Sequence, residues 1–377
     1  MRLEEICTVF TDGDWIESKD QSDDGIRLVQ TGNIGEGIYL EKEARAKYIS
    51  EETFEKLKCT EIFPGDILVS RLPDPVGRAC IIPEKEERMI TAVDCTICRP
   101  NESIISKEYL CYFMRSSAYY KRLLGSVTGT TRKRISRKNL GNVELEVPSK
   151  ERQMDVVEQL DCLVKVIESR KQELQLLDNL IKARFVEMFG DAVANPMHWP
   201  VKKLKELSVQ INSGNTPKGG SENYVEEGIT FFRSQNVWKD RLEMDDIAYI
   251  DATTHASMKR SSLKHGDILM TKTGRINTEN SSLGRAALYD GEDDMANVNG
   301  HVYFIRLKDG VNNKFVLRIL VSPEYRELIR CVCVGGIDKR QLNKEHIEDF
   351  PIICPPSDMV DDYILFVEQV DKSCFVW

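Results

Sequence analysis

The sequence predicts an α+β fold in which two repeated mixed α/β domains are joined by one long coiled-coil spacer helix. Three observations support this prediction. A series of short sequence motifs recurs in the same order in the two halves of the chain. Within each half, short β-branched runs and an amphipathic helical pattern follow one another without regular alternation, which is typical of α+β domains. Between the halves, apolar residues recur every three or four positions in a stretch without glycine or proline.

The repeat is clearest in the motif Gly-Asp-Ile-Leu, which occurs at 65–68 and again at 266–269. Val-Gly-Arg-Ala at 76–79 corresponds to Leu-Gly-Arg-Ala at 283–286, so the offset between the copies rises only from 201 to 207 residues. Further corresponding pairs are 25–34 with 228–237, 94–100 with 301–307, 109–123 with 315–329, 129–140 with 336–347, and 145–149 with 352–356. Because the matches are collinear, they predict two copies of one domain of about 150 residues.

Local patterns within each copy predict its strands and its main helix. The runs 67–69 and 268–270 follow turn residues and are rich in aliphatic side chains, so they are predicted to be strands. The runs 95–98 and 302–305 are predicted to be strands as well. The segment 107–124 has apolar residues at helical spacing and is expected to form an amphipathic helix.

The segment between the copies is predicted to be one long helix. Ser149 is a suitable N-cap, and Gly190 is the first glycine after it. A seam of about six heptads is expected to bind partner helices, and it consists of Val157, Leu160, Val164, Ile167, Leu174, Ile181, Phe185 and Met188. Some 40 residues of helix would be about 60 Å long. A second amphipathic stretch begins after Pro356 and is expected to form a shorter counterpart that ends at Trp377.

Composition places the chain among ordinary globular proteins. Its charged fraction is 30% and its net charge is −9, which argues against a polyanion-binding surface over the whole molecule but allows a local basic patch. Residues 121–138 contain seven Lys or Arg residues and no acid. No membrane span and no signal peptide are expected. Eleven cysteines without a secretion signal suggest reduced thiols and a cytoplasmic location.

Motifs for catalysis and metal binding are missing from the sequence. There is no phosphate-binding glycine loop, no Gly-x-Ser-x-Gly motif, and no pair of histidines at metal-ligand spacing. Cys95 and Cys98 resemble half of a zinc site, but the repeat places Val302 and Ile305 at the same positions. Positions filled by valine and isoleucine are expected to be buried in a strand, so no metal site is predicted. The pattern favours a binding protein with two heads over an enzyme.

The repeated motifs and the helix resemble the specificity subunits of type I restriction-modification systems. The resemblance rests on the two Gly-Asp-Ile-Leu motifs, the two Gly-Arg-Ala motifs, Lys-Glu-Arg-Gln at 150–153, and Ala-Arg-Phe-Val-Glu-Met-Phe-Gly-Asp at 183–191. It covers nearly the whole chain. In the second copy, Ser-Asp-Met-Val at 357–360 stands where the resemblance leads us to expect a Glu-Gln pair. The expected domains are a first target recognition domain at 1–148, a spacer helix at 149–191, a second target recognition domain at 192–355, and a shortened second spacer helix at 356–377.

The resemblance implies a function in DNA recognition without catalysis by this chain. Each domain would recognise one half of a split, asymmetric site in double-stranded DNA, and the spacer would set the distance between the halves. The chain would recruit two methyltransferase subunits and a motor-nuclease subunit. S-adenosylmethionine, ATP and Mg²⁺ would be bound by those partners, and no cofactor by this chain.

Candidate DNA-binding residues are the arginine, lysine, asparagine and glutamine side chains that follow predicted strands, because these side chains form paired hydrogen bonds with base edges. In the first copy they are Gln30, Asn33, Arg71, Arg78, Arg132, Lys133 and Arg134. In the second copy they are Arg233, Gln235, Asn236, Lys272, Arg275, Arg285, Lys339 and Arg340. Arg78 and Arg285 recur between the copies, which favours a structural or phosphate-binding role over base recognition. Asparagine also favours turns, so a turn role for Asn33 and Asn236 stays open.

Two alternatives remain at the level of the sequence. The shortened second helix is also consistent with a truncated or inactive specificity subunit. A protein-binding scaffold with two heads is the other alternative. DNA binding through phosphates would weaken steeply with salt, which distinguishes it from scaffolding.

Overall fold

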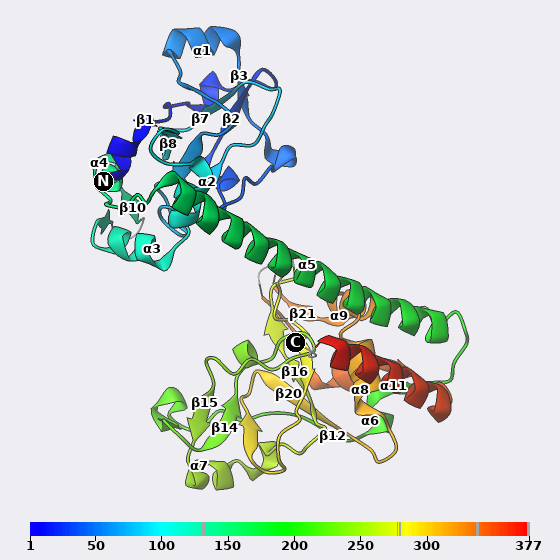
Figure 1. Cartoon of the computed structure of the whole chain (residues 1–377). Coiled ribbons are helices and arrows are strands. Elements are labelled where there is room, and N and C mark those ends of the chain that lie inside the picture. Colours follow the sequence, from blue (N-terminus) through cyan, green and yellow to red (C-terminus); the bar gives the residue numbers. More distant parts are fainter. Residues whose placement is uncertain (130–132, 277, 279, 337–338, 375–377) are drawn as a thin grey trace. The chain divides into compact units, whose positions relative to one another are not determined.

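The chain divides into two compact units, Met1–Arg170 and Lys171–Trp377, and the division falls within the long helix α5 (Lys150–Phe189). The structure is a computed structural model that describes residues 1–129, 133–276, 278, 280–336 and 339–374 (Figure 1). The predicted domain boundaries stay a prediction. The uninterrupted helix of 40 residues confirms the expected spacer helix.

The first unit contains two four-stranded sheets. The orders are β1-β8-β5-β6, which is antiparallel throughout, and β3-β2-β7-β4, in which β2 and β7 are parallel. The strands are β1 (Cys7–Asp12), β2 (Ile26–Val29), β3 (Tyr48–Ile49), β4 (Glu61–Ile62), β5 (Ile67–Ser70), β6 (Ala79–Ile81), β7 (Met89–Thr91), β8 (Cys95–Pro100), and the hairpin β9 (Val127–Thr128) and β10 (Arg134–Ile135). All residues of β2, β5 and β7 are buried, as expected for central strands rich in aliphatic side chains.

The α-helices of the first unit begin at serine caps. Each cap's hydroxyl oxygen accepts a hydrogen bond from the backbone N–H three residues later, which stabilises the first helical turn. The α-helices are α1 (Glu51–Leu57), α2 (Lys107–Phe113), α3 (Ser117–Leu124) and α4 (Arg137–Gly141), and the 3-10 helices are η1 (Leu3–Ile6), η2 (Ser18–Asp20), η3 (Thr31–Asn33) and η4 (Glu43–Arg45).

The second unit repeats this architecture. Its four-stranded sheets have the orders β12-β20-β16-β18 and β13-β15-β14-β19. The strands are β11 (Val201–Lys203), β12 (Ser208–Ser213), β13 (Tyr224–Val225), β14 (Ile229–Phe232), β15 (Ala248–Ile250), β16 (Ile268–Thr271), β17 (Thr273–Gly274), β18 (Ala286–Leu288), β19 (Ala296–Val298), β20 (Val302–Leu307), β21 (Val334–Gly335), β22 (Arg340–Gln341) and β23 (Pro351–Ile353). The helices are α6 (Leu204–Leu207), η5 (Gly220–Asn223), η6 (Ser234–Asn236), α7 (Ala252–Ser257), η7 (Lys259–Ser261), α8 (Asn313–Leu320), α9 (Pro323–Val332), α10 (Lys344–Glu348) and α11 (Ser357–Cys374).

Strand register confirms that the two units are copies of one fold. Ile67 of β5 lies opposite Cys98 of β8, and Ile268 of β16 lies opposite Ile305 of β20. These pairs are separated by the offsets of 201 and 207 that the sequence motifs predict. The α+β class and the duplication are therefore both correct.

A buried ion pair explains the aspartate of both Gly-Asp-Ile-Leu motifs. Asp66 accepts two hydrogen bonds from Arg99, at 2.7 and 2.8 Å, and a third from the N–H of Phe63 at 2.9 Å. Asp267 likewise accepts two hydrogen bonds from the Arg306 guanidinium, at 2.9 and 2.7 Å. The two carboxylates are 2% and 1% exposed. The motif therefore ties the turn before one central strand to its neighbouring strand.

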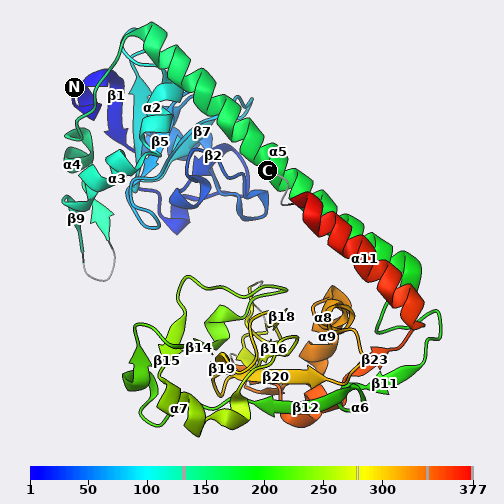
Figure 2. The ribbon, with the colours of Figure 1, turned by 60° about the horizontal axis from the view of Figure 1, so that its bottom comes forward.

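The C-terminal part of α5 belongs to the core of the second unit. Ile181 and Phe189 are buried there, and the Phe189 ring lies 5.5 Å from the ring of Tyr363 in α11. Arg184 lies over Phe366 at 5.9 Å, so α11 runs antiparallel to this part of α5 (Figure 2). Phe185 and Met188 pack against the same core.

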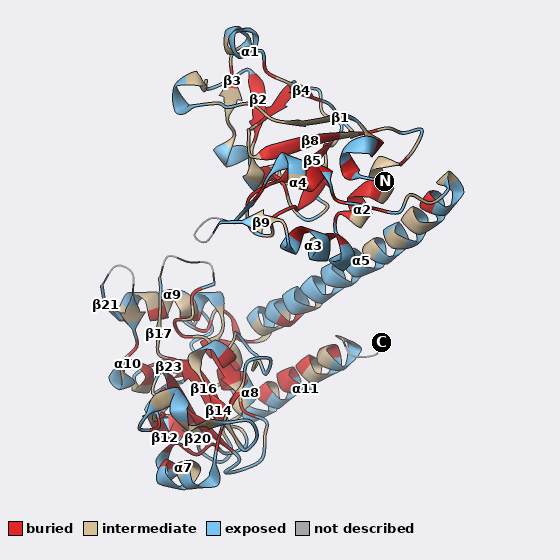
Figure 3. Ribbon diagram, turned by 90° about the vertical axis from the view of Figure 1, so that its left-hand side faces the viewer, coloured by how far each residue is buried: buried red, intermediate tan, exposed pale blue. Residues whose placement is uncertain are grey.

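The predicted coiled-coil seam is covered only in part. Val157, Leu160 and Val164 are half-buried, whereas Ile167 and Leu174 are 53% and 50% exposed. Most of the helix between its two ends is therefore solvent-exposed (Figure 3). Among the described residues, no helix is long and apolar enough to cross a membrane.

The ion pairs predict a matched pair of stability effects. Asp66→Asn is expected to lower the free energy of unfolding by about 2–4 kcal/mol, because it leaves Arg99 without its anionic partner beside a buried turn. Asp267→Asn should have a similar effect. Urea-induced unfolding of the full chain measures both changes. Asp349→Asn is the control, since the Asp349 carboxylate is half exposed in its pairs with Lys203 and Lys205 and its loss should have a much smaller effect on stability. Equal effects of all three substitutions would contradict the assignment.

Candidate nucleic-acid interface

Three segments of the first unit meet at one end of the sheet β1-β8-β5-β6. Here β1 and β5 end and β8 begins, so residues near 12, 71 and 94 become neighbours. The N–H of Arg71 donates to the carbonyl of Asp94 at 2.9 Å, and the N–H of Ile135 donates to the carbonyl of Arg71 at 3.2 Å. The hairpin β9–β10 thereby joins the sheet end. We call Asp12, Arg71, Asp94, Arg134 and Arg137 the first rim.

Charges alternate along the first rim. Arg71 lies 3.3 Å from Asp12, and its Nη2 donates to the carbonyl of Val93 at 2.6 Å. Burial lowers the pKa of Arg71, while Asp12 opposes that shift. Arg134 pairs with Asp94 at 2.8 Å, and Arg137 lies 3.9 Å from Asp12. The Arg71 side chain is 6% exposed but those of Arg134 and Arg137 are 46% and 48% exposed, so the latter two can reach a ligand.

Two other predicted residues belong to the same loop as Arg134. Lys133 is exposed and directly precedes β10. Arg132 lies outside the described residues. The loop therefore adds positive charge beside the first rim.

The second unit has the same backbone arrangement with different side chains. The N–H of Lys272 donates to the carbonyl of His301 at 2.8 Å, and the N–H of Leu342 donates to the carbonyl of Lys272 at 2.9 Å. By the repeat, the second rim is Ser213, Lys272, His301 and Gln341, in the places of Asp12, Arg71, Asp94 and Arg134. Both carboxylates of the first rim are thus replaced by groups without a fixed negative charge.

The cations in the second rim and in the segments next to it are less constrained than those of the first rim. The Lys272 ammonium lies 5.7 Å from the centre of the Tyr303 ring. Arg275 and Lys339 are exposed, and none of these three side chains forms an ion pair with a described residue. Arg340 donates weakly to the carbonyl of Cys333 at 3.5 Å. These side chains are available to an incoming anion.

The predicted asparagines are turn residues in both units, which is the alternative role that the sequence leaves open for them. Asn33 Oδ1 accepts from the N–H of Gln30 at 3.0 Å, and its Nδ2 donates to the carbonyl of Leu40 at 2.9 Å. Asn236 Oδ1 accepts from the N–H of Arg233 at 3.0 Å, and its Nδ2 donates to the carbonyl of Glu243 at 3.1 Å. Both side chains are buried, and their amide groups form hydrogen bonds with the backbone. Gln30 is half-buried beside its turn.

Two further predicted residues share one carboxylate. Arg233 lies 3.2 Å from Asp246, and Gln235 Nε2 donates to the same Oδ2 at 2.9 Å. The hydrogen bond from Gln235, followed by those from Arg233, lowers the pKa of Asp246. A nucleic acid would have to displace this carboxylate to engage either side chain.

The recurring arginines Arg78 and Arg285 differ in their surroundings. The Arg78 guanidinium is buried and donates to the carbonyls of Thr31, Ile34, Leu72 and Pro75 at 2.7–3.2 Å. The Arg78 guanidinium thus links two loops of the first unit. Arg285 is half-buried, donates to the carbonyl of Ser281 at 3.0 Å, and lies 3.9 Å over the ring of Trp238. Burial lowers its pKa, and the neighbouring Arg326 and Arg241 add to that shift.

Cys95 and Cys98 occupy opposite faces of their sheet. Cys95 packs in a cluster with Leu68, whereas Cys98 packs with Ile67. Burial raises the pKa of Cys95 to about 12. Two thiols on opposite faces cannot bind one metal ion, in agreement with the prediction of core positions. Among the described residues, no group of three His, Cys, Asp or Glu side chains could hold a metal ion.

The rim acids were missed by the sequence analysis. Asp12 and Asp94 carry the negative charge that the predicted arginines pair with. The repeat contained a usable signal, because both acids flank strands whose counterparts in the second copy carry Ser213 and His301. Only the strand order shows that these flanks meet.

Comparisons with known proteins agree with this architecture. Residues 1–179 match the family model described as the type I restriction modification DNA specificity domain. The chain is 22% identical to the type I restriction enzyme StySPI specificity subunit of Salmonella potsdam over 73% of its own length, and it spans 60% of that relative. It is 23% identical to the EcoKI specificity subunit of Escherichia coli (strain K12), covering 47% of this chain and 40% of that one.

Solved structures show a similar fold. One comes from work on complex assembly and conformational transition of the type I R-M system, with a TM-score of 0.52 and 16% identity. It covers 99% of this chain and 90% of that chain. Another is the S subunit of a type I restriction-modification system from M. genitalium, with a TM-score of 0.50 and 13% identity over 99% of this chain and 91% of that one. The chain is therefore similar in sequence to specificity subunits of type I restriction-modification systems, and residues 1–179 match that family's DNA specificity domain.

Proposed function

We propose that this chain recognises a split, asymmetric site in double-stranded DNA, with one unit on each half. The observation that carries the proposal is the pair of rims. Their backbone hydrogen bonds correspond between the units, but their side chains differ at Asp12 and Ser213, Asp94 and His301, and Arg134 and Gln341. A duplicated frame supports two recognition heads, and different side chains on it support two different half-sites.

Each rim would combine phosphate contacts with base contacts. The half-exposed Arg134 and Arg137 can pair with phosphates or with guanine edges once DNA competes with Asp94 and Asp12. In the second rim, Lys272 would supply a phosphate contact, and Gln341 offers an amide that can pair with adenine. Arg275, which is exposed and follows Lys272 in the chain, would add a further phosphate contact. The carboxylates of Asp12 and Asp94 in the first rim would repel phosphates that approach them instead of the arginines.

The long helix would set the distance between the half-sites. A continuous helix resists bending better than a flexible linker, and α5 has no glycine or proline within it. Its length would translate into a fixed number of base pairs, at about 3.4 Å for each.

Chemistry would reside in the partners, as the similarity to specificity subunits supports. We expect two methyltransferase subunits and a motor-nuclease subunit, which would bind S-adenosylmethionine, ATP and Mg²⁺. The exposed apolar residues of α5 offer a docking surface for a partner, and they include Leu163, Val166, Ile167, Leu174 and Leu176. A cytoplasmic location would fit this role.

The function can be tested by DNA modification. Co-expression with the cognate methyltransferase subunit, followed by sequencing of modified bases, should yield one split motif with a fixed gap. Exchange of Gln341 for arginine should change only one half of that motif, because this side chain belongs to one rim. A continuous motif, or the absence of modification by an assembled complex, would contradict the proposal and favour the protein-binding scaffold or the inactive subunit.

Two rim cations, the exposed Arg134 and the half-buried Lys272, predict a salt effect. Arg134→Ala and Lys272→Ala should each reduce the slope of log affinity against log salt by about 1, because each removes one phosphate contact. Fluorescence anisotropy of labelled duplex DNA, with the methyltransferase partner present, measures the slope. Lys56→Ala is the matched control, since this exposed lysine lies on α1 and outside both rims. Unchanged slopes in both rim variants would exclude the rims as phosphate contacts.

Substitution of the turn asparagines, in contrast to substitution of the rim cations, should lower stability and leave the salt dependence of DNA binding unchanged. Asn33→Ala and Asn236→Ala should each lower the free energy of unfolding by about 1–3 kcal/mol, because buried backbone groups lose their partners. At a temperature where the variants stay folded, the salt slope of DNA binding should equal that of the parent chain. A reduced slope with unchanged stability would restore these residues as DNA contacts.

A further inference from the structure

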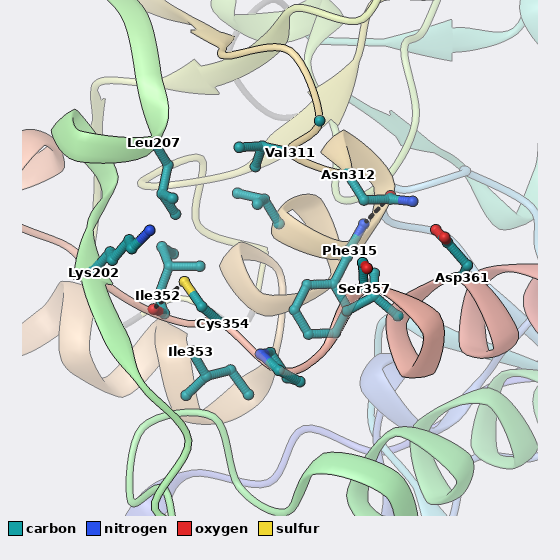
Figure 4. A pocket seen from close by; sticks show the side chains of 14 residues that line it. Lys202, Leu207, Val311, Asn312, Phe315, Ile352, Ile353, Cys354, Ser357 and Asp361 are labelled. Atoms are coloured by element: carbon teal, nitrogen blue, oxygen red, sulfur yellow. Dashed lines mark hydrogen bonds between the residues drawn. The ribbon is translucent and has the colours of Figure 1, made fainter.

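A pocket of about 500 Å³ opens in the second unit where β11, β23, α8 and α11 meet (Figure 4). Its walls are largely apolar and include Phe315, Ile353 and Val360. Lys202, Asn312 and Ser357 add polar groups at its edge. None of these residues belongs to the second rim, so the pocket is separate from the proposed DNA site.

The corresponding place in the first unit is filled by the side chain of Gln153. This side chain is buried, and its Oε1 accepts from the N–H of Ser106 at 2.8 Å. Its Nε2 donates to the carbonyls of Ile104 and Pro148, both at 3.0 Å. A primary amide therefore satisfies one backbone donor and two backbone acceptors at once.

The repeat places Val360 where Gln153 stands. Gln153 N–H donates to the carbonyl of Ser149 at 2.9 Å, and Val360 N–H donates to the carbonyl of Pro356 at 3.2 Å, so both lie in the first turn of their helices. Ser357 likewise replaces Lys150, whose ammonium reaches the carbonyl of Glu102 in the first unit. Two shorter side chains thus open the space.

The backbone groups around the space correspond between the units. Ser106 caps α2 and Asn312 caps α8, each accepting from the N–H three residues later at 3.1 Å. Pro355 takes the place of Pro148 before the long helix. Valine cannot hydrogen-bond, so the N–H of Asn312 and the carbonyl of Pro355 have no hydrogen-bond partner among the described residues, and both residues line the pocket.

We propose that this pocket binds a primary carboxamide on an aliphatic stem, supplied as a glutamine side chain by a partner polypeptide or as free glutamine. The amide oxygen would accept from Asn312, and the amide nitrogen would donate to Pro355, as Gln153 does with their counterparts. The aliphatic stem would lie against Phe315 and Val360. A carboxylate of the same shape lacks the donor and places negative charge beside the Pro355 carbonyl, so it should bind at least about tenfold more weakly.

Probe binding provides the first test. The full chain, labelled with ¹⁵N-asparagine, is titrated with N-acetyl-L-glutamine N-methylamide, and the Asn312 N–H signal is expected to shift in a saturable way. The glutamate analogue of the probe should shift it only at concentrations about tenfold higher or more. Free L-glutamine forms a second arm, because binding of the capped probe alone would identify a polypeptide source. Equal binding of the amide and the acid would overturn the proposal.

A reciprocal exchange between the units supplies the second test. Val360→Gln should fill the pocket, raise the melting temperature and abolish the Asn312 response. Leu365→Gln is the matched control, because it adds the same side chain at a position on α11 that is 56% exposed. It should leave the melting temperature and the Asn312 response unchanged. Gln153→Val should open the equivalent pocket in the first unit and create a new response at Ser106, observed with ¹⁵N-serine. Probe binding that survives Val360→Gln would contradict the assignment even if the Gln153 variant failed to fold.

Discussion

The pairing of the central strands depends on one buried ion pair in each unit. Asp66 and Arg99, like Asp267 and Arg306, join the turn before one central strand to the far end of its neighbour through two parallel hydrogen bonds. A carboxylate with 2% or less exposure is costly to bury alone, so a shift in strand register that separated the pair would be strongly unfavourable. Register in turn decides which loops meet at the end of each sheet, and therefore where the rims lie.

The two units share this backbone framework. They differ mainly in side chains that take no part in its internal contacts. At the rims, Asp12 and Asp94 pair with arginines in the first unit, while Ser213 and His301 leave Lys272 unpaired among the described residues in the second. The units also differ at the start of α5 and α11, where the Gln153 side chain fills a space that the shorter Val360 side chain leaves open. Duplication thus preserved the backbone contacts and allowed each copy its own surface chemistry.

The candidate residues divide according to recurrence between the copies. Asn33 and Asn236 recur and serve turns, and the recurring Arg78 links two loops. Arg134 does not recur in kind, because Gln341 stands in its place, and its side chain is 46% exposed at the first rim. A side chain that recurs in both copies therefore tends to have a structural role. Contacts within the shared backbone framework have to be kept in both copies, whereas contacts with an asymmetric ligand are free to differ.

The sequence by itself determined the duplication, the α+β class, the long helix and the core positions of Cys95 and Cys98. These features follow from local periodicity and from matched motifs, which need no knowledge of distant contacts. Only the tertiary structure decided which polar side chains form hydrogen bonds inside the protein and which face solvent. The partners of Asn33, Arg78 and Gln153 lie in other segments of the chain, and long-range strand pairing and helix docking bring those segments together.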